Sequence, residues 1–149
     1  MSEHVNHIRR LATEHAQVDG ALLPILHAVQ SAIGYLPQET AATVADVLNL
    51  SRADVHGVIT FYHLFRTTEP GKHTLYMCRA EACQSMGANA LADHVRDKLS
   101  IDWHETTSDG RVSLEPIYCL GNCACAPAVM VDTTLHGRVT ADRLDEILD

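Results

Sequence analysis

Two pairs of cysteines constrain the fold of this chain more than any other feature of its sequence. Cys78 and Cys83 enclose the four residues RAEA, whereas Cys119 and Cys123 enclose the three residues LGN. Each pair follows a segment with the pattern of a β-strand, and a helical pattern separates the two segments. A strand, a helix and a strand in this order form a parallel pair whose carboxyl ends lie at the same edge of a sheet. We therefore expect the four thiols to lie close together.

The second half of the chain has the pattern of a small mixed domain. Residues 73–78 and 112–117 alternate as strands do, and a helix is predicted between them from about Ser85. After the second cysteine pair, the apolar run AVMV predicts a buried strand and TLHGRV a strand antiparallel to it, followed by a last helix from about Thr140. This order, βαβ and then ββα, is compatible with a thioredoxin-like core.

In the first half, apolar residues recur at helical spacing instead. One helix is predicted to end at Ile33, with Gly34 as its C-terminal cap, and another is predicted to end just before Ser51. Ser51 and Asp54 have the spacing of a capping box, which predicts that a further helix begins directly after Ser51. A weaker helix is predicted over residues 5–16.

The segment TEPGK is the clearest break in the chain, because Pro70 and Gly71 stand side by side where the periodicity changes. We place the domain boundary there. The predicted fold is α+β, with an N-terminal helical bundle over residues 1–70 and a second domain over residues 71–149.

The cysteines are expected to be reduced. The opening residues contain no apolar stretch of the kind found in secretory signals, which predicts a cytoplasmic protein. The count of five cysteines is odd, which argues against a disulfide framework. Clustered thiolates in tetrahedral sets select zinc or an iron–sulfur cluster.

The spacing of the two pairs favours a binuclear cluster. Zinc knuckles mostly use cysteines separated by two residues, and neither pair has that spacing. Plant-type ferredoxins begin with four intervening residues, as here, but need a third cysteine at the position of Met86. The wider pairs suit a cluster in which each pair holds one iron, with a structural four-cysteine zinc module as the alternative. Small residues beside the thiols, such as Gly121, let backbone N–H groups approach the sulfurs.

Cys125 and Arg79 lie next to the two cysteine pairs in the sequence, and each has a predicted role of its own. Cys125 is interpreted as a small buried side chain, with replacement of a neighbouring ligand as the alternative. Arg79 and the helix N-terminus expected near Ser85 would stabilise the extra negative charge of a reduced cluster.

The acidic balance of the chain argues against nucleic acid and membrane partners. Nineteen acidic and eleven basic side chains give a formal charge of −8, which repels phosphates and anionic lipid head groups. The segment ATVADVLNLSRADVHGVITFY has the spacing of a helix-turn-helix, but it lacks the basic residues that a DNA-binding protein needs. The most apolar stretch, ALLPILHAVQSAIGYL, is interrupted by polar residues and too short to insert across a bilayer.

Without a dinucleotide fingerprint, a Walker motif or a nucleophile elbow, the chain itself is expected to bind no NAD and to perform no hydride chemistry.

The runs MCRAEACQSMGANAL and IYCLGNCACAPAVMVD resemble the thioredoxin-like 2Fe-2S subunits of NADH-linked flavoprotein modules. Such subunits occur in respiratory complex I, in NAD-reducing hydrogenases and in cytosolic NAD-dependent formate dehydrogenases. The first half of the chain also looks like the N-terminal helical part of that family. Within it, the run CRAEACQSMG looks most like the gamma subunit of the molybdenum- or tungsten-containing formate dehydrogenases.

The resemblance implies a thioredoxin-like 2Fe-2S ferredoxin domain over residues 71–149. It places the four cluster ligands on Cys78, Cys83, Cys119 and Cys123 and leaves Cys125 outside the set. It also implies a non-catalytic electron-transfer subunit of a formate dehydrogenase complex. The partners would be a flavoprotein subunit, which holds FMN and the NAD(H) site, and a larger molybdenum or tungsten subunit that oxidises formate. The equivalent subunit of an NAD-reducing hydrogenase or of complex I is the alternative.

Overall fold

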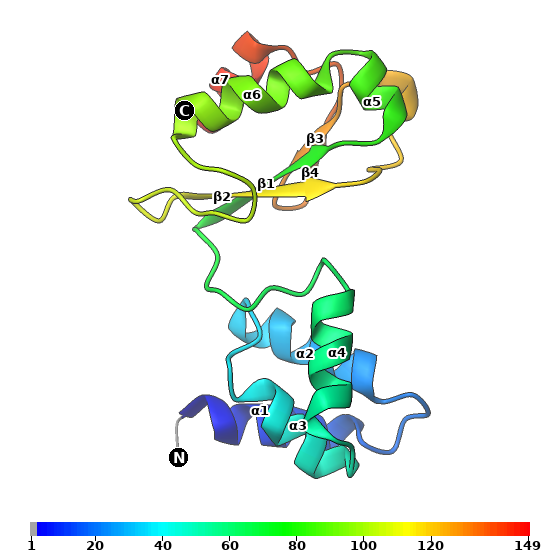
Figure 1. The fold of residues 1–149 in the computed structure, drawn as a ribbon. Coiled ribbons are helices and arrows are strands. Elements are labelled where there is room, and N and C mark those ends of the chain that lie inside the picture. Colours follow the sequence, from blue (N-terminus) through cyan, green and yellow to red (C-terminus); the bar gives the residue numbers. More distant parts are fainter. Residues whose placement is uncertain (1–2) are drawn as a thin grey trace. The chain divides into compact units, whose positions relative to one another are not determined.

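The computed structural model describes residues 3–149. The chain divides into two compact units, the first ending at Glu69 and the second beginning at Pro70 (Figure 1). None of the helices among these residues has the length and hydrophobicity of a membrane-spanning segment.

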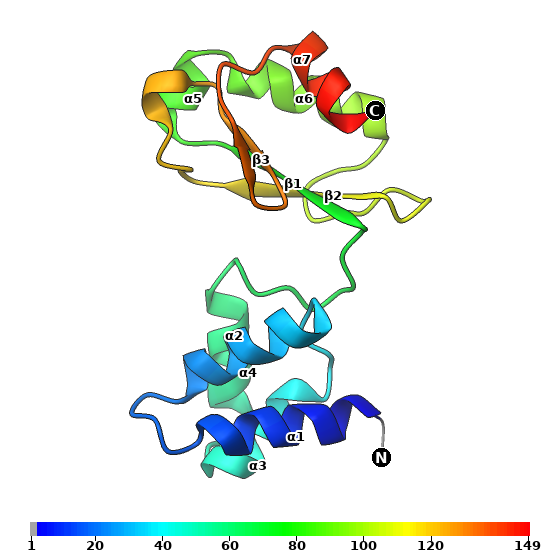
Figure 2. The ribbon, with the colours of Figure 1, turned by 180° about the vertical axis from the view of Figure 1, so that it is seen from behind.

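The first unit is helical and has its own core. The helix α1 packs against α2 and α3, and α3 packs against α4 (Figure 2). Ile25, Leu26 and Val29 of α2 are fully buried together with Val44 and Val55 from the next two helices. The bounds of these helices are α1 Glu3–His15, α2 Leu22–Ile33, α3 Thr40–Leu48 and α4 Arg52–Phe61.

Both end signals predicted for these helices are confirmed. Gly34 adopts a left-handed conformation with φ of 95°, and its N–H donates to the Gln30 carbonyl oxygen at 2.7 Å. The Ser51 hydroxyl accepts the Asp54 N–H at 3.0 Å, and the Asp54 carboxylate accepts the Ser51 N–H at 3.3 Å. This reciprocal pair is the capping box, and it begins α4 at Arg52.

The second unit is a four-stranded sheet with the strand order β2-β1-β3-β4. The strands β1 and β2 are parallel, whereas β3 is antiparallel to both β1 and β4. The predicted βαβ and ββα order is therefore confirmed. The bounds of the strands are β1 His73–Cys78, β2 Val112–Ile117, β3 Val129–Val131 and β4 Thr134–His136.

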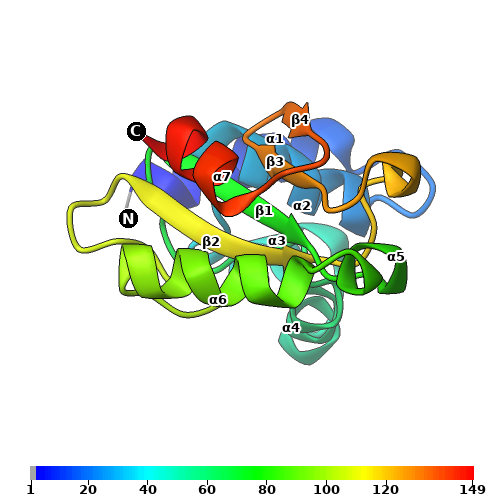
Figure 3. The same ribbon diagram turned by 90° about the horizontal axis from the view of Figure 1, so that it is seen from above.

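Two longer helices, α6 Ala88–Leu99 and α7 Ala141–Leu148, lie side by side on one face of this sheet (Figure 1 and Figure 3). Leu75 and Leu114 from the two parallel strands are fully buried beneath them. Val95 of α6 and Leu144 of α7 complete the centre of this core.

The helix predicted from about Ser85 begins three residues later in the structure, and a short helix that was not predicted precedes it. The short helix α5 covers Glu81–Ser85, and α6 begins only at Ala88. Gly87 separates them with a φ of 93°, a left-handed conformation that interrupts helical hydrogen bonding. The Met86 and Gly87 N–H groups donate instead to the Cys83 and Gln84 carbonyl oxygens. Cys83 thus lies on a helical turn of its own.

Candidate metal centre

Two loops leave the sheet at the same edge, and each of them carries one cysteine pair. Cys78 is the last residue of β1 and lies opposite Ile117, the last residue of β2. The Arg79 N–H extends this pairing by donating to the Ile117 carbonyl oxygen at 2.7 Å. The shared edge that the sequence predicts is therefore present. Helix α5 and the 3-10 turn η1 Cys123–Cys125, drawn in orange, lie next to each other there (Figure 1 and Figure 2).

The second pair is arranged like two ligands of one metal ion. The Sγ atoms of Cys119 and Cys123 are 3.7 Å apart. Two thiolates bound at about 2.3 Å to one tetrahedral ion stand about 3.8 Å apart. The Gly121 N–H also donates to Cys119 Sγ at 3.3 Å, as expected for a glycine beside the thiols. Such N–H groups stabilise negative charge on sulfur.

The two pairs differ in their exposure to solvent. Cys78 and Cys83 are 2% and 1% exposed, and they form a small apolar cluster with Ala88, Ala126 and Ala128. Cys119 and Cys123 are exposed. The site is therefore dry on the side of β1 and α5 and open on the side of the loop after β2.

The pKa shifts link the two pairs electrostatically. Burial raises the pKa of the Cys83 thiol, and Cys78 and Cys123 raise it further. The neighbouring Cys119 raises the pKa of Cys123, with smaller contributions from burial and from Cys78. Thiols this close resist ionising together in the absence of a cation. A bound metal reverses the preference, because only the thiolates coordinate it and their protons are released.

Two other residues in these loops have partners that the sequence did not indicate. The Arg79 guanidinium lies over the Trp103 ring, 5.0 Å from its centroid. Cys125, at the end of the turn η1, is half-buried, and its carbonyl oxygen accepts the Arg138 N–H at 2.6 Å. Both contacts join segments far apart in the sequence, so no local pattern could reveal them.

Cys119 and Cys123 form one close thiol pair, and a side-chain hydrogen bond joins Cys78 and Cys83 as a second pair. Two such pairs could hold a binuclear cluster, which takes one pair on each iron.

The chain belongs to the thioredoxin-like [2Fe-2S] ferredoxin family, whose model matches residues 8–149. A 2Fe-2S cluster is the cofactor that this family binds, and the donor set of two thiol pairs fits it.

Relatives of the chain are subunits of redox complexes. The NADP-reducing hydrogenase subunit HndA of Solidesulfovibrio fructosivorans is 39% identical over 132 residues, covering 89% of this chain and 77% of the relative. One subunit of the NADH-quinone oxidoreductase of Rhizobium meliloti is 35% identical over 142 residues, covering 95% of this chain and 84% of the relative.

A solved structure supports the fold. A chain of the air-oxidised NAD+-reducing [NiFe]-hydrogenase superposes on 85% of this chain with a TM-score of 0.70 and 24% identity. This chain spans 22% of the length of that hydrogenase chain.

Proposed function

We propose that Cys78, Cys83, Cys119 and Cys123 hold one 2Fe-2S cluster, and that this chain is an electron-transfer subunit of an NAD-dependent formate dehydrogenase. The observation that carries the proposal is the pairing of thiols at one sheet edge, with Cys119 and Cys123 separated by the distance of two ligands on one ion. When bound, the cluster takes up and passes on one electron at a time.

The residues of this chain have separate tasks in the proposal. Cys78 and Cys83 anchor the cluster on the dry side, where the small side chains of Ala88 and Ala128 exclude water. Cys119 and Cys123 hold it on the open side, where a partner protein can approach closely. The Gly121 N–H stabilises negative charge on the Cys119 sulfur.

The proposed partner on the open side is a flavoprotein subunit that carries FMN and the NAD(H) site, in a cytoplasmic complex. Its support is that relatives are subunits of an NADP-reducing hydrogenase and of an NADH-quinone oxidoreductase. In this arrangement the chain relays electrons and performs no hydride transfer itself.

The proposed parent complex rests on the run CRAEACQSMG around the first cysteine pair, which resembles formate dehydrogenase gamma subunits. The names of the relatives favour a hydrogenase or complex I as the second candidate. A molybdenum or tungsten subunit that oxidises formate would belong only to the first candidate.

Purification of the complex from its native cells, through a tag on this chain, separates the candidates. We expect an FMN-containing flavoprotein and a molybdenum or tungsten protein to co-purify, and the complex to reduce NAD+ with formate. A complex carrying Cys119→Ser should lose this activity. Reduction of NAD+ with hydrogen but not formate, or electron transfer from NADH to quinone only, would favour the second candidate.

A further inference from the structure

The loop between β4 and α7 lies directly against the turn that carries Cys123. A Cβ atom placed on Gly137 would lie 2.7 Å from Cys125 Cβ, 2.7 Å from Asn122 Nδ2 and 2.9 Å from the Cys125 carbonyl oxygen. Contacts of this length are far inside van der Waals separation. Two of the three atoms belong to or adjoin the backbone of Cys125, so rotation of a flexible side chain cannot relieve the overlap.

The two residues after Gly137 fasten the same loop. The Arg138 N–H donates to the Cys125 carbonyl oxygen at 2.6 Å, and the Val139 N–H donates to the Pro127 carbonyl oxygen at 3.1 Å. The Val139 side chain is 2% exposed and belongs to the core beneath α6 and α7. Residues 137–139, here called the clamp segment, therefore tie the turn to that core.

The thiol of Cys123 depends on its backbone for its position. It is exposed, so no packed core surrounds its side chain, and its sulfur must stay 3.7 Å from Cys119 Sγ to share an ion with it. The Cys125 N–H closes the turn on the Asn122 carbonyl oxygen at 3.0 Å, and a side chain at Gly137 would collide with both of these residues.

We infer that Gly137 is a positioning residue for the cluster: its missing side chain lets the clamp segment hold the turn of Cys123 at the distance from Cys119 that the iron needs. This inference rests on the proposed ligand set.

The matched pair of variants is Gly137→Ala and Gly71→Ala. A Cβ on Gly71 would also meet backbone, at 3.0 Å from the Val112 nitrogen and 3.1 Å from the Arg111 carbonyl carbon. Gly71 lies two residues before His73, where β1 begins, whereas Cys78 is the last residue of β1. The clash of Gly71→Ala therefore lies at the opposite end of the strand from the cysteines. Both variants should lose stability, but only Gly137→Ala should disturb the cluster.

We expect the reduced Gly137→Ala protein to show changed EPR g-values and a shifted midpoint potential, and to lose iron to a chelator about 10-fold faster than wild type. Gly71→Ala should retain wild-type g-values, potential and iron release. Wild-type behaviour in Gly137→Ala, or the same change in both variants, would overturn the inference. If Gly137→Ala does not fold, the variant Val139→Ala tests the same segment, because it loosens the attachment of the clamp segment to the core and should disturb the cluster in the same way. Its control is Val95→Ala, which removes a side chain of the same size from the same core and should leave the cluster unchanged.

A measurement without metal separates this inference from the ligand proposal. In the apoprotein, diamide takes two electrons and two protons from the Cys119 and Cys123 thiols and joins them as a disulfide, which peptide mapping detects. A displaced turn should slow this reaction in Gly137→Ala relative to Gly71→Ala. Equal rates of disulfide formation in the two variants would contradict the positioning role of Gly137. A wild-type protein that binds no cluster would contradict the proposed ligand set alone.

Discussion

Cys123 and Cys125 stand two residues apart on one 3-10 turn, yet their surroundings differ. Cys123 is exposed and lies 3.7 Å from the sulfur of Cys119. Cys125 is half-buried beside Gly137, and its backbone oxygen accepts a hydrogen bond from Arg138. One residue faces the centre formed by the thiols, and the other joins the turn to the clamp segment.

A pair of serine variants tests this division. Because serine is a poor ligand for iron, Cys123→Ser should lose or alter the cluster, with iron content at about half of wild type or less and changed visible absorption. Cys125→Ser should retain wild-type iron and spectrum. Loss of the cluster in Cys125→Ser but not in Cys123→Ser would show that the ligands are assigned wrongly.

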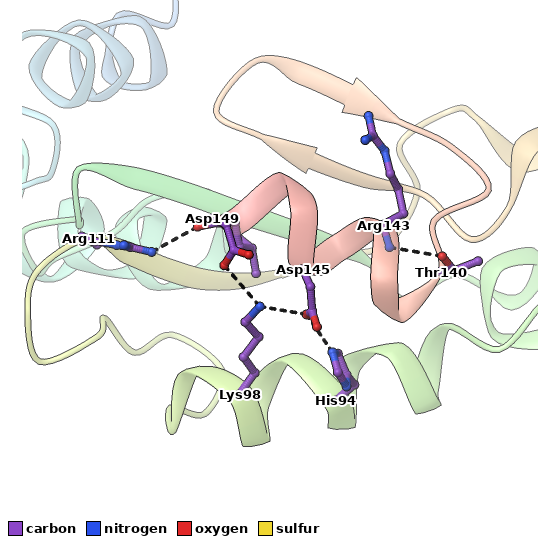
Figure 4. Close-up of polar contacts among 8 residues, drawn as sticks. His94, Lys98, Arg111, Thr140, Arg143, Asp145 and Asp149 are labelled. Atoms are coloured by element: carbon purple, nitrogen blue, oxygen red, sulfur yellow. Dashed lines mark hydrogen bonds and ion pairs between the residues drawn. The ribbon is translucent and has the colours of Figure 1, made fainter.

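One polar network joins the last helix of the chain to α6 and to the loop before β2 (Figure 4). Asp145 of α7 accepts hydrogen bonds from His94 at 2.8 Å and Lys98 at 3.1 Å, both on α6. The hydrogen bond from His94 and then that from Lys98 lower the pKa of Asp145 below its ordinary 3.8. Arg111 adds a hydrogen bond to the Leu148 carbonyl oxygen at 3.1 Å. The clamp segment leads directly into this helix.

The lowered pKa of Asp145 predicts how pH acts on the fold. A depressed carboxyl pKa stabilises the folded state above the ordinary value of 3.8, and the stabilisation is lost as pH falls through the lower folded value. Asp145→Asn should therefore lower the melting temperature at pH 7, and the difference from wild type should shrink below pH 3.8. Glu146→Gln, which breaks one exposed pair with Arg143 on the same helix, should have the smaller effect. A difference in melting temperature between Asp145→Asn and wild type that stays the same at every pH would contradict this role of the Asp145 carboxylate.

The capping box of α4 is expected to stabilise the helical unit. Ser51→Ala removes the hydroxyl that accepts the Asp54 N–H and should lower the free energy of unfolding by about 1 kcal/mol. Urea denaturation followed by circular dichroism measures the change. The control is Ser31→Ala within α2, where alanine is the better helix former and stability should be equal or slightly higher. Equal effects of the two changes would contradict the role of the cap.

At the scale of the whole molecule, the sequence indicated those features that depend on neighbouring residues in the chain. The strands, the cap at Gly34 and the capping box at Ser51 follow from periodicity and from residues three or four apart. The short helix α5 and the break after it at Gly87 were missed, because the backbone conformation of a glycine is not visible in its neighbours. The contact of Gly137 with Cys125 was missed because only the folded sheet brings the two loops together.

Each of the two units has a core of its own, and we propose that residues 71–149 form an independent cluster domain. Expressed without the helical unit, this fragment should fold and show the EPR g-values of the whole chain. Circular dichroism and EPR on the fragment provide the test. A fragment that folds but binds no iron would show that the helical unit is needed for the site.

We propose above that the four paired thiols hold a 2Fe-2S cluster. Its most direct test is iron and acid-labile sulfide analysis of the purified chain, combined with EPR after dithionite reduction. We expect about two iron and two sulfide per chain and a rhombic spin-half signal. Stoichiometric zinc without sulfide, in a colourless protein with no such signal, would contradict it.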